Sequence, residues 1–146
     1  MQDSPKNDVN LTVLGTGCAT SCGTGCVSFL LLMLVTTVIG VQAVRHGYGL
    51  SLVGFPLGMV SHLVVGYVTA QVARDKDATV NTHVLILGSI IMIIGLFGLL
   101  TSEKNATAFG IQVQVQAVNQ LLGILNWMLT IPLMLLGASW SADDKS

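Results

Sequence analysis

Residues Val84–Leu100 read VLILGSIIMIIGLFGLL, a stretch in which no residue carries a charge. A helix rises about 1.5 Å per residue, so a run of this length comes close to crossing the hydrocarbon core of a membrane, which is about 30 Å thick. Backbone polar groups find no water in lipid, which makes a helix the expected conformation. The stretch therefore predicts a transmembrane helix.

Three further uncharged stretches accompany it, at about Cys26–Val44, Leu50–Ala73 and Leu121–Ala138. The links between them are short, and short links make consecutive helices antiparallel. We therefore predict an all-α integral membrane protein, an up-down bundle of four transmembrane helices in a lipid bilayer. Residues 26–138 form its membrane domain, between a polar Gly- and Cys-containing N-terminal tail (1–25) and a polar C-terminal tail (139–146).

The composition supports a membrane location. Apolar residues make up 52% of the chain and charged residues only 9%, whereas soluble domains carry about 25% charged residues. The mean hydropathy is +0.76. The net charge of −1 leaves no basic surface to neutralise phosphates, so we expect no nucleic-acid partner.

The basic residues indicate an orientation. Cytoplasmic segments of membrane proteins carry an excess of Lys and Arg near the spans. With both termini in the cytoplasm, four basic residues lie on that side (Lys6, Arg74, Lys76, Lys145) and two on the other (Arg45, Lys104). We expect cytoplasmic termini.

Small residues recur every four positions in the second span. Gly54, Gly58 and Gly66 belong to this series, and glycines at such spacing allow two helix backbones to approach closely. Gly88 and Gly95 form a similar, weaker series in the third span. We expect these glycines to pack against another helix, in the same chain or in a partner.

His62 is an ionisable residue deep inside the second span, and such residues are candidates for function. A neutral imidazole can ligate haem iron or relay protons. It can also make a hydrogen bond between helices. We predict no cofactor, with a haem-bearing membrane anchor as an alternative.

The fourth span carries a polar stripe at helical spacing. Its members fall within an arc of about 80° if the segment is helical throughout: Gln112, Gln116, Asn119, Gly123, Asn126 and Thr130. The stripe would face the bundle, a partner subunit, or a path for water or a small solute. The alternation of residues 112–116 also permits an extended segment, which would shorten the stripe.

Cysteines recur within the repeated sequence Gly-Thr-Gly-Cys near the N-terminus. Cys18, Cys22 and Cys26 are four residues apart, although the glycine-rich context disfavours a helix. Lipidation at a membrane boundary, a disulfide, and packing of small side chains all remain open. Three thiols without a nearby fourth ligand do not match a zinc site, so we expect no metal.

The sequence favours a function without catalysis. All acidic residues lie in tails or loops, and no phosphate-binding glycine loop or HExxH motif occurs. The glycine series and the uncharged polar stripe are both typical of helix association. We therefore expect a small subunit, scaffold or assembly factor of a membrane complex that binds other membrane-protein helices. The alternatives are a small oligomeric channel or transporter that uses the polar stripe, and the haem-bearing anchor.

Overall fold

The computed structural model describes residues 9–39, 48–101, 105–108, 111–114 and 117–143. These parts of the chain form four helices, each long and apolar enough to span a membrane: α1 (Leu11–Ile39), α3 (Tyr48–Asp75), α4 (Val80–Thr101) and α5 (Ala117–Asp143). A short antiparallel hairpin of β1 (Asn105–Ala108) and β2 (Ile111–Gln114) lies between α4 and α5, with Asn105 opposite Gln114.

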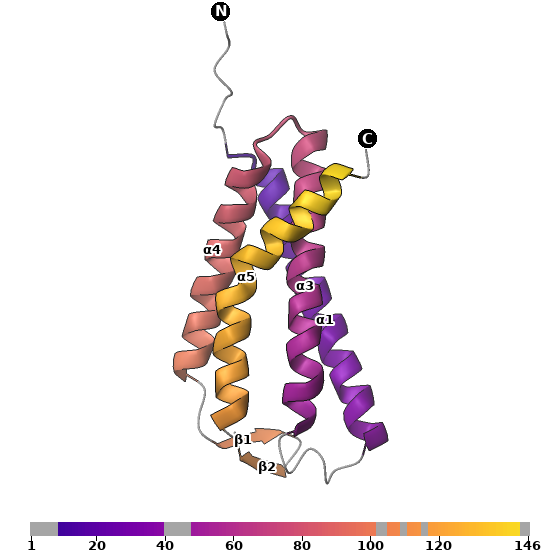
Figure 1. Cartoon of the computed structure of the whole chain (residues 1–146), viewed down its shortest axis with the longest axis vertical. Helices are drawn as coiled ribbons and strands as arrows, with labels where there is room; N and C mark the ends of the chain where they lie inside the picture. The colour runs from indigo at the N-terminus through magenta and orange to yellow at the C-terminus, as the bar shows by residue number, and fades with distance from the viewer. Residues whose placement is uncertain (1–8, 40–47, 102–104, 109–110, 115–116, 144–146) are drawn as a thin grey trace, which may run out of the picture.

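Helix α3 is central to the arrangement. It packs most extensively against α5 and also against α1, while α4 packs mainly against α5. Figure 1 shows the start of α1, the α3–α4 turn and the end of α5 at one end of the molecule, with the β-hairpin at the other. The buried apolar cluster lies toward the first of these ends, because it draws on the later turns of α3 and α5 and the early turns of α4: Val65, Ala70, Val84, Leu87, Met134 and Ala138.

The first helix begins earlier than the sequence indicated. We expected a polar tail up to residue 25 and a span from Cys26, but α1 already begins at Leu11. Hydroxyl groups within the glycine-rich segment are satisfied by the helix itself, as Thr16 and Thr20 each donate to the carbonyl four residues earlier, at 2.9 Å. Gly17 also packs closely against Leu87 and Thr69, so tertiary contacts offset its low helix propensity.

The last helix ends later than expected. The predicted C-terminal tail began at residue 139, whereas α5 continues to Asp143. Arg74, in the last turn of α3, donates hydrogen bonds to the Ser141 hydroxyl at 2.7 Å and to the Ala138 carbonyl at 3.2 Å. These bonds hold the final turns of α5 against α3. Residues 144–146 lie outside the described residues.

Helix α5 changes direction in its middle (Figure 1). Pro132 lies within this helix, and proline both lacks the backbone N–H for the helical hydrogen bond and clashes with the preceding turn. The bend therefore has a local chemical cause. It turns the second half of α5 across α3, where Gly66 and Gly137 each lie against the main chain of the other helix.

The α3–α4 turn is a helix C-cap with a left-handed residue. Asp77 has a φ of 50°. The Ala78 N–H donates to the Ala73 carbonyl at 2.8 Å, and the Asp77 N–H donates to the Arg74 carbonyl at 3.1 Å. This is the hydrogen-bond pattern of the Schellman motif, in which glycine is the usual left-handed residue.

Candidate functional site

The α3–α5 interface brings together glycines of α3 and polar residues of α5. A Cβ atom added to Gly58 would lie 2.6 Å from Nδ2 and 2.9 Å from Oδ1 of Asn126. At Gly66, an added Cβ would overlap the main-chain carbonyl of Met134. Two members of the predicted glycine series therefore contact a helix of the same chain. Gly54 differs, because no described atom lies within 4 Å of its added Cβ.

The contact is reciprocal. Gly137 on α5 lies so close to α3 that an added Cβ would overlap the carbonyl oxygen of Leu63. Close approach thus depends on glycine on both helices, Gly66 on one and Gly137 on the other. Gly137 was not among the glycines expected to pack, because no glycine lies four residues before or after it. The available signal was Ser141, a small residue four positions later.

His62 and Thr130 meet at this interface. The His62 Nε2 atom lies 3.3 Å from the Thr130 hydroxyl oxygen, and that hydroxyl donates to the Asn126 carbonyl at 3.3 Å. Because the hydroxyl has one proton, a consistent set of bonds has His62 donating from Nε2–H. The side chain of His62 therefore takes part in a hydrogen bond between helices, one of the three roles considered for it.

Asn126 contributes a buried acceptor beside this pair. Within the described part of the chain its Oδ1 atom has no hydrogen-bond partner. Asn126 and Thr130 belong to the predicted polar stripe, and both contact α3. Within a single chain, Asn126 and Thr130 therefore face α3.

The predicted stripe is not one continuous helix, because its N-terminal part precedes α5. Gln112 lies in strand β2, and α5 begins only at Ala117. Strand pairing with β1 through backbone hydrogen bonds is the physical reason, and the alternation of residues 112–116 had allowed for it. Asn119 lies in the first turn of α5, where only its backbone is described, and Gln116 lies outside the described residues. The helical part of the stripe is therefore the part on α5: Asn119, Gly123, Asn126 and Thr130.

The glycines of α4 also face α5. An added Cβ at Gly88 would lie 2.9 Å from Cγ1 of Ile131, and one at Gly95 would lie 3.1 Å from Cδ1 of Trp127. The Trp127 indole N–H donates to the Met92 carbonyl at 2.7 Å. An indole N–H in an apolar setting needs an acceptor, and Gly95 provides the space in which the ring reaches one.

Helix α1 presents a different surface. Cys18, Cys22 and Cys26 are exposed and carry free thiols. Gly15 is also exposed, and among the described residues nothing lies within 4 Å of its added Cβ. At about 100° per residue these four fall within an arc of about 80°. We call them the outer face of α1. Lipidation of the cysteines stays a prediction.

His83 is a structural residue that the sequence analysis did not single out. It is buried, and both ring nitrogens engage the backbone, with Nδ1 2.8 Å from the Thr79 carbonyl and Nε2 2.8 Å from the Asn10 N–H. In the described ranges, no group of three His, Cys, Asp or Glu side chains comes together in a way that would hold a metal ion.

Comparison of the chain with protein-family models, with curated proteins and with solved structures finds no match.

Proposed function

We propose that the chain is a multi-pass membrane protein, an up-down bundle that works through helix association as a subunit, scaffold or assembly factor of a membrane complex. Insertion is supported by the four long apolar helices and by large apolar side chains on the surface, including Leu30, Ile93, Ile94 and Phe97. Soluble monomers rarely expose contiguous apolar patches of this kind to water.

The proposed orientation has both termini in the cytoplasm. Arg74 and Lys76 belong to the end of α3 and the turn that follows it, and Figure 1 places this turn beside the start of α1 and the end of α5. The positive-inside rule assigns such a basic end to the cytoplasm. The remaining basic residues used in the sequence argument lie outside the described residues.

The observation that carries the proposal is the outer face of α1. Residues of α5 already occupy the space beside Gly58, Gly66, Gly88 and Gly95. By contrast, no described atom lies within 4 Å of a Cβ added to Gly15, and the three cysteines are exposed. Small side chains let a second helix approach closely in lipid, where van der Waals packing drives association. This face therefore suits a helix of another membrane protein.

The alternatives draw less support from these contacts. A pore along the polar stripe of a single copy would need Asn126 and Thr130 to line an open path, but both contact α3. An oligomeric pore built from several copies stays a separate proposal. A haem anchor would require His62 to release Thr130 and to find a second axial ligand.

A cross-linking experiment tests the proposal. Cys22 is kept as the only cysteine, with Cys18 and Cys26 changed to Ser, and is labelled in native membranes with a photoreactive maleimide. Leu136, an exposed residue of α5, supplies the control position as Leu136→Cys in a chain without other cysteines. We expect a discrete larger adduct from Cys22 and none from position 136.

Two matched substitutions sharpen the result. Neither Gly15 nor Gly23 has a described atom within 4 Å of its added Cβ, so both tolerate a side chain, yet only Gly15 belongs to the outer face. Gly15→Leu should abolish the Cys22 adduct, and Gly23→Leu should leave it. The same adduct from both positions, or none from Cys22, contradicts the proposal. An adduct with twice the mass of the chain favours the oligomeric channel.

A further inference from the structure

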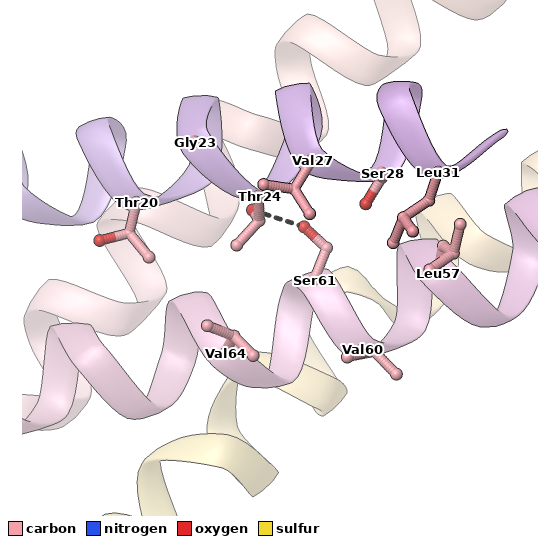
Figure 2. A pocket seen from close by; sticks show the side chains of 10 residues that line it. All are labelled: Thr20, Gly23, Thr24, Val27, Ser28, Leu31, Leu57, Val60, Ser61 and Val64. Atoms are coloured by element: carbon pink, nitrogen blue, oxygen red, sulfur yellow. Dashed lines mark hydrogen bonds between the residues drawn. The ribbon is translucent and has the colours of Figure 1, made fainter. Parts of the chain in front are cut away.

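A groove of about 450 Å³ runs between α1 and α3 on the side of α1 away from its outer face. Helix α1 lines it from Thr20 to Leu31, and α3 lines it from Leu57 to Val64. Figure 2 shows the two helices side by side, with Thr24 and Ser61 joined across the groove. The other lining residues are Thr20, Gly23, Ser28 and the apolar Val27, Leu31, Leu57, Val60 and Val64.

The walls offer little to a polar ligand. None of the described residues that line the groove carries a charge. Three of its hydroxyls donate within the protein, Ser61 to the Thr24 oxygen at 2.7 Å, Thr24 to the Ser21 carbonyl at 3.1 Å, and Thr20 to the Thr16 carbonyl. Besides these three hydroxyls, the lining consists of methyl and methylene groups and the Ser28 hydroxyl. The groove is therefore suited to a hydrocarbon.

The size of the groove matches one lipid chain. A volume of about 450 Å³ is many times the roughly 10–15 Å³ that a single water molecule needs, so the groove admits a chain of methylene groups. The distance from Thr20 to Leu31 along α1 is about 16 Å at 1.5 Å per residue. That is about half the hydrocarbon thickness of a bilayer, the depth that one leaflet supplies.

We propose that this groove binds a single acyl chain of a membrane lipid. The proposal rests on the membrane location proposed above and does not depend on the partner at the outer face of α1. Since no charge lines the groove, the lipid is selected by its chain, and its headgroup has little influence. Gly23 lies at the exposed rim of the groove, and no described atom lies within 4 Å of its added Cβ, so a large side chain there would extend over the groove.

Native mass spectrometry tests this inference. The full chain is reconstituted in vesicles of one phosphatidylcholine, extracted in a mild detergent and measured intact. We expect the unmodified chain to retain one phospholipid and Gly23→Leu to lose it. Val60→Phe fills the groove from α3, at a position that is 54% exposed, and should also lose the lipid. Gly25→Leu is the control and should retain it, because Gly25 is an exposed glycine of α1 that belongs neither to the groove nor to the outer face, with no described atom within 4 Å of its added Cβ.

Three results would overturn the proposal: no retained lipid in the unmodified chain, full retention in both Gly23→Leu and Val60→Phe, or a polypeptide bound in place of lipid. If the protein retains phosphatidylglycerol and phosphatidylcholine with the same acyl chains to different extents, the headgroup is recognised, which would contradict recognition through the acyl chain. Washing the membranes at alkaline pH separates the two proposals. Release of the protein refutes the membrane location itself, whereas a retained protein without bound lipid refutes only the lipid site.

Discussion

The Nε2 atom of His83 accepts a hydrogen bond from the backbone N–H of Asn10 at 2.8 Å and thereby ties the start of α1 to the first turn of α4. The Nδ1 atom lies 2.8 Å from the Thr79 carbonyl, so the ring donates at Nδ1 and accepts at Nε2. Asn10 in turn caps α1, because its Oδ1 accepts the Thr12 N–H at 3.0 Å. One imidazole thus connects two helix N-termini.

Replacing His83 with Leu should destabilise the protein by about 1–3 kcal/mol, because the part-buried Asn10 N–H would lose its acceptor. The free energy of unfolding is measured by titration with SDS in mixed micelles. Asn81→Leu, at an exposed position of the same helix, is the control and should change stability little. Equal stability of the two variants would mean that the His83 bond contributes nothing.

Gly66→Ala should destabilise the protein by about 1–3 kcal/mol, the usual cost of overpacking. The added methyl group would overlap the main chain of Met134, which cannot move away without shifting α5. Gly54→Ala is the matched substitution in the same helix. It meets no described atom within 4 Å and should gain up to about 1 kcal/mol from helix propensity.

The same SDS titration distinguishes these two glycines. A similar change in unfolding free energy at positions 54 and 66 would show that α3 and α5 do not approach as closely as Gly66 and Met134 indicate. A Gly137→Ala variant tests the opposite helix, because its methyl group would overlap the Leu63 carbonyl. We expect it to lose stability as Gly66→Ala does.

Trp127→Phe should cost about 0.5–1.5 kcal/mol, the net contribution of one hydrogen bond. Phenylalanine keeps the ring against Gly95 but cannot donate to the Met92 carbonyl. Trp140→Phe is the control, because the Trp140 side chain is 53% exposed. Both variants are compared by thermal unfolding in detergent, and a larger effect at position 140 would contradict the role given to the Trp127 indole.

Asp77→Gly should stabilise the protein by about 1 kcal/mol. Asp77 adopts a φ of 50°, and a left-handed conformation costs a residue with a Cβ roughly 1–2 kcal/mol. Glycine adopts it without that cost. Lys76→Gly moves the glycine by one position and should bring no gain. If both variants lose stability, the Asp77 side chain contributes more to the turn than its conformation costs.

The apolar runs located a helix end well where a charged residue ends the run. Arg74 marks the end of α3, and α4 was expected to cover Val84–Leu100 within its observed range. The start of α1 was misplaced because Gly-Thr-Gly was judged by its propensity in water. The threonine hydroxyls bond inside the helix and Gly17 packs against Leu87 and Thr69, and neither effect is visible in a propensity scale.

The sequence by itself determined that four helices long and apolar enough to span a membrane would form, because helix formation in apolar runs depends on local composition and backbone hydrogen bonding. It also indicated glycines as points of close approach. Only the tertiary structure decided which helix fills each glycine, that Asn126 and Thr130 face α3, and that Gly15 and Gly23 remain open. Such pairings depend on the relative rotation and crossing of helices, which are set by side-chain packing between segments far apart in the chain.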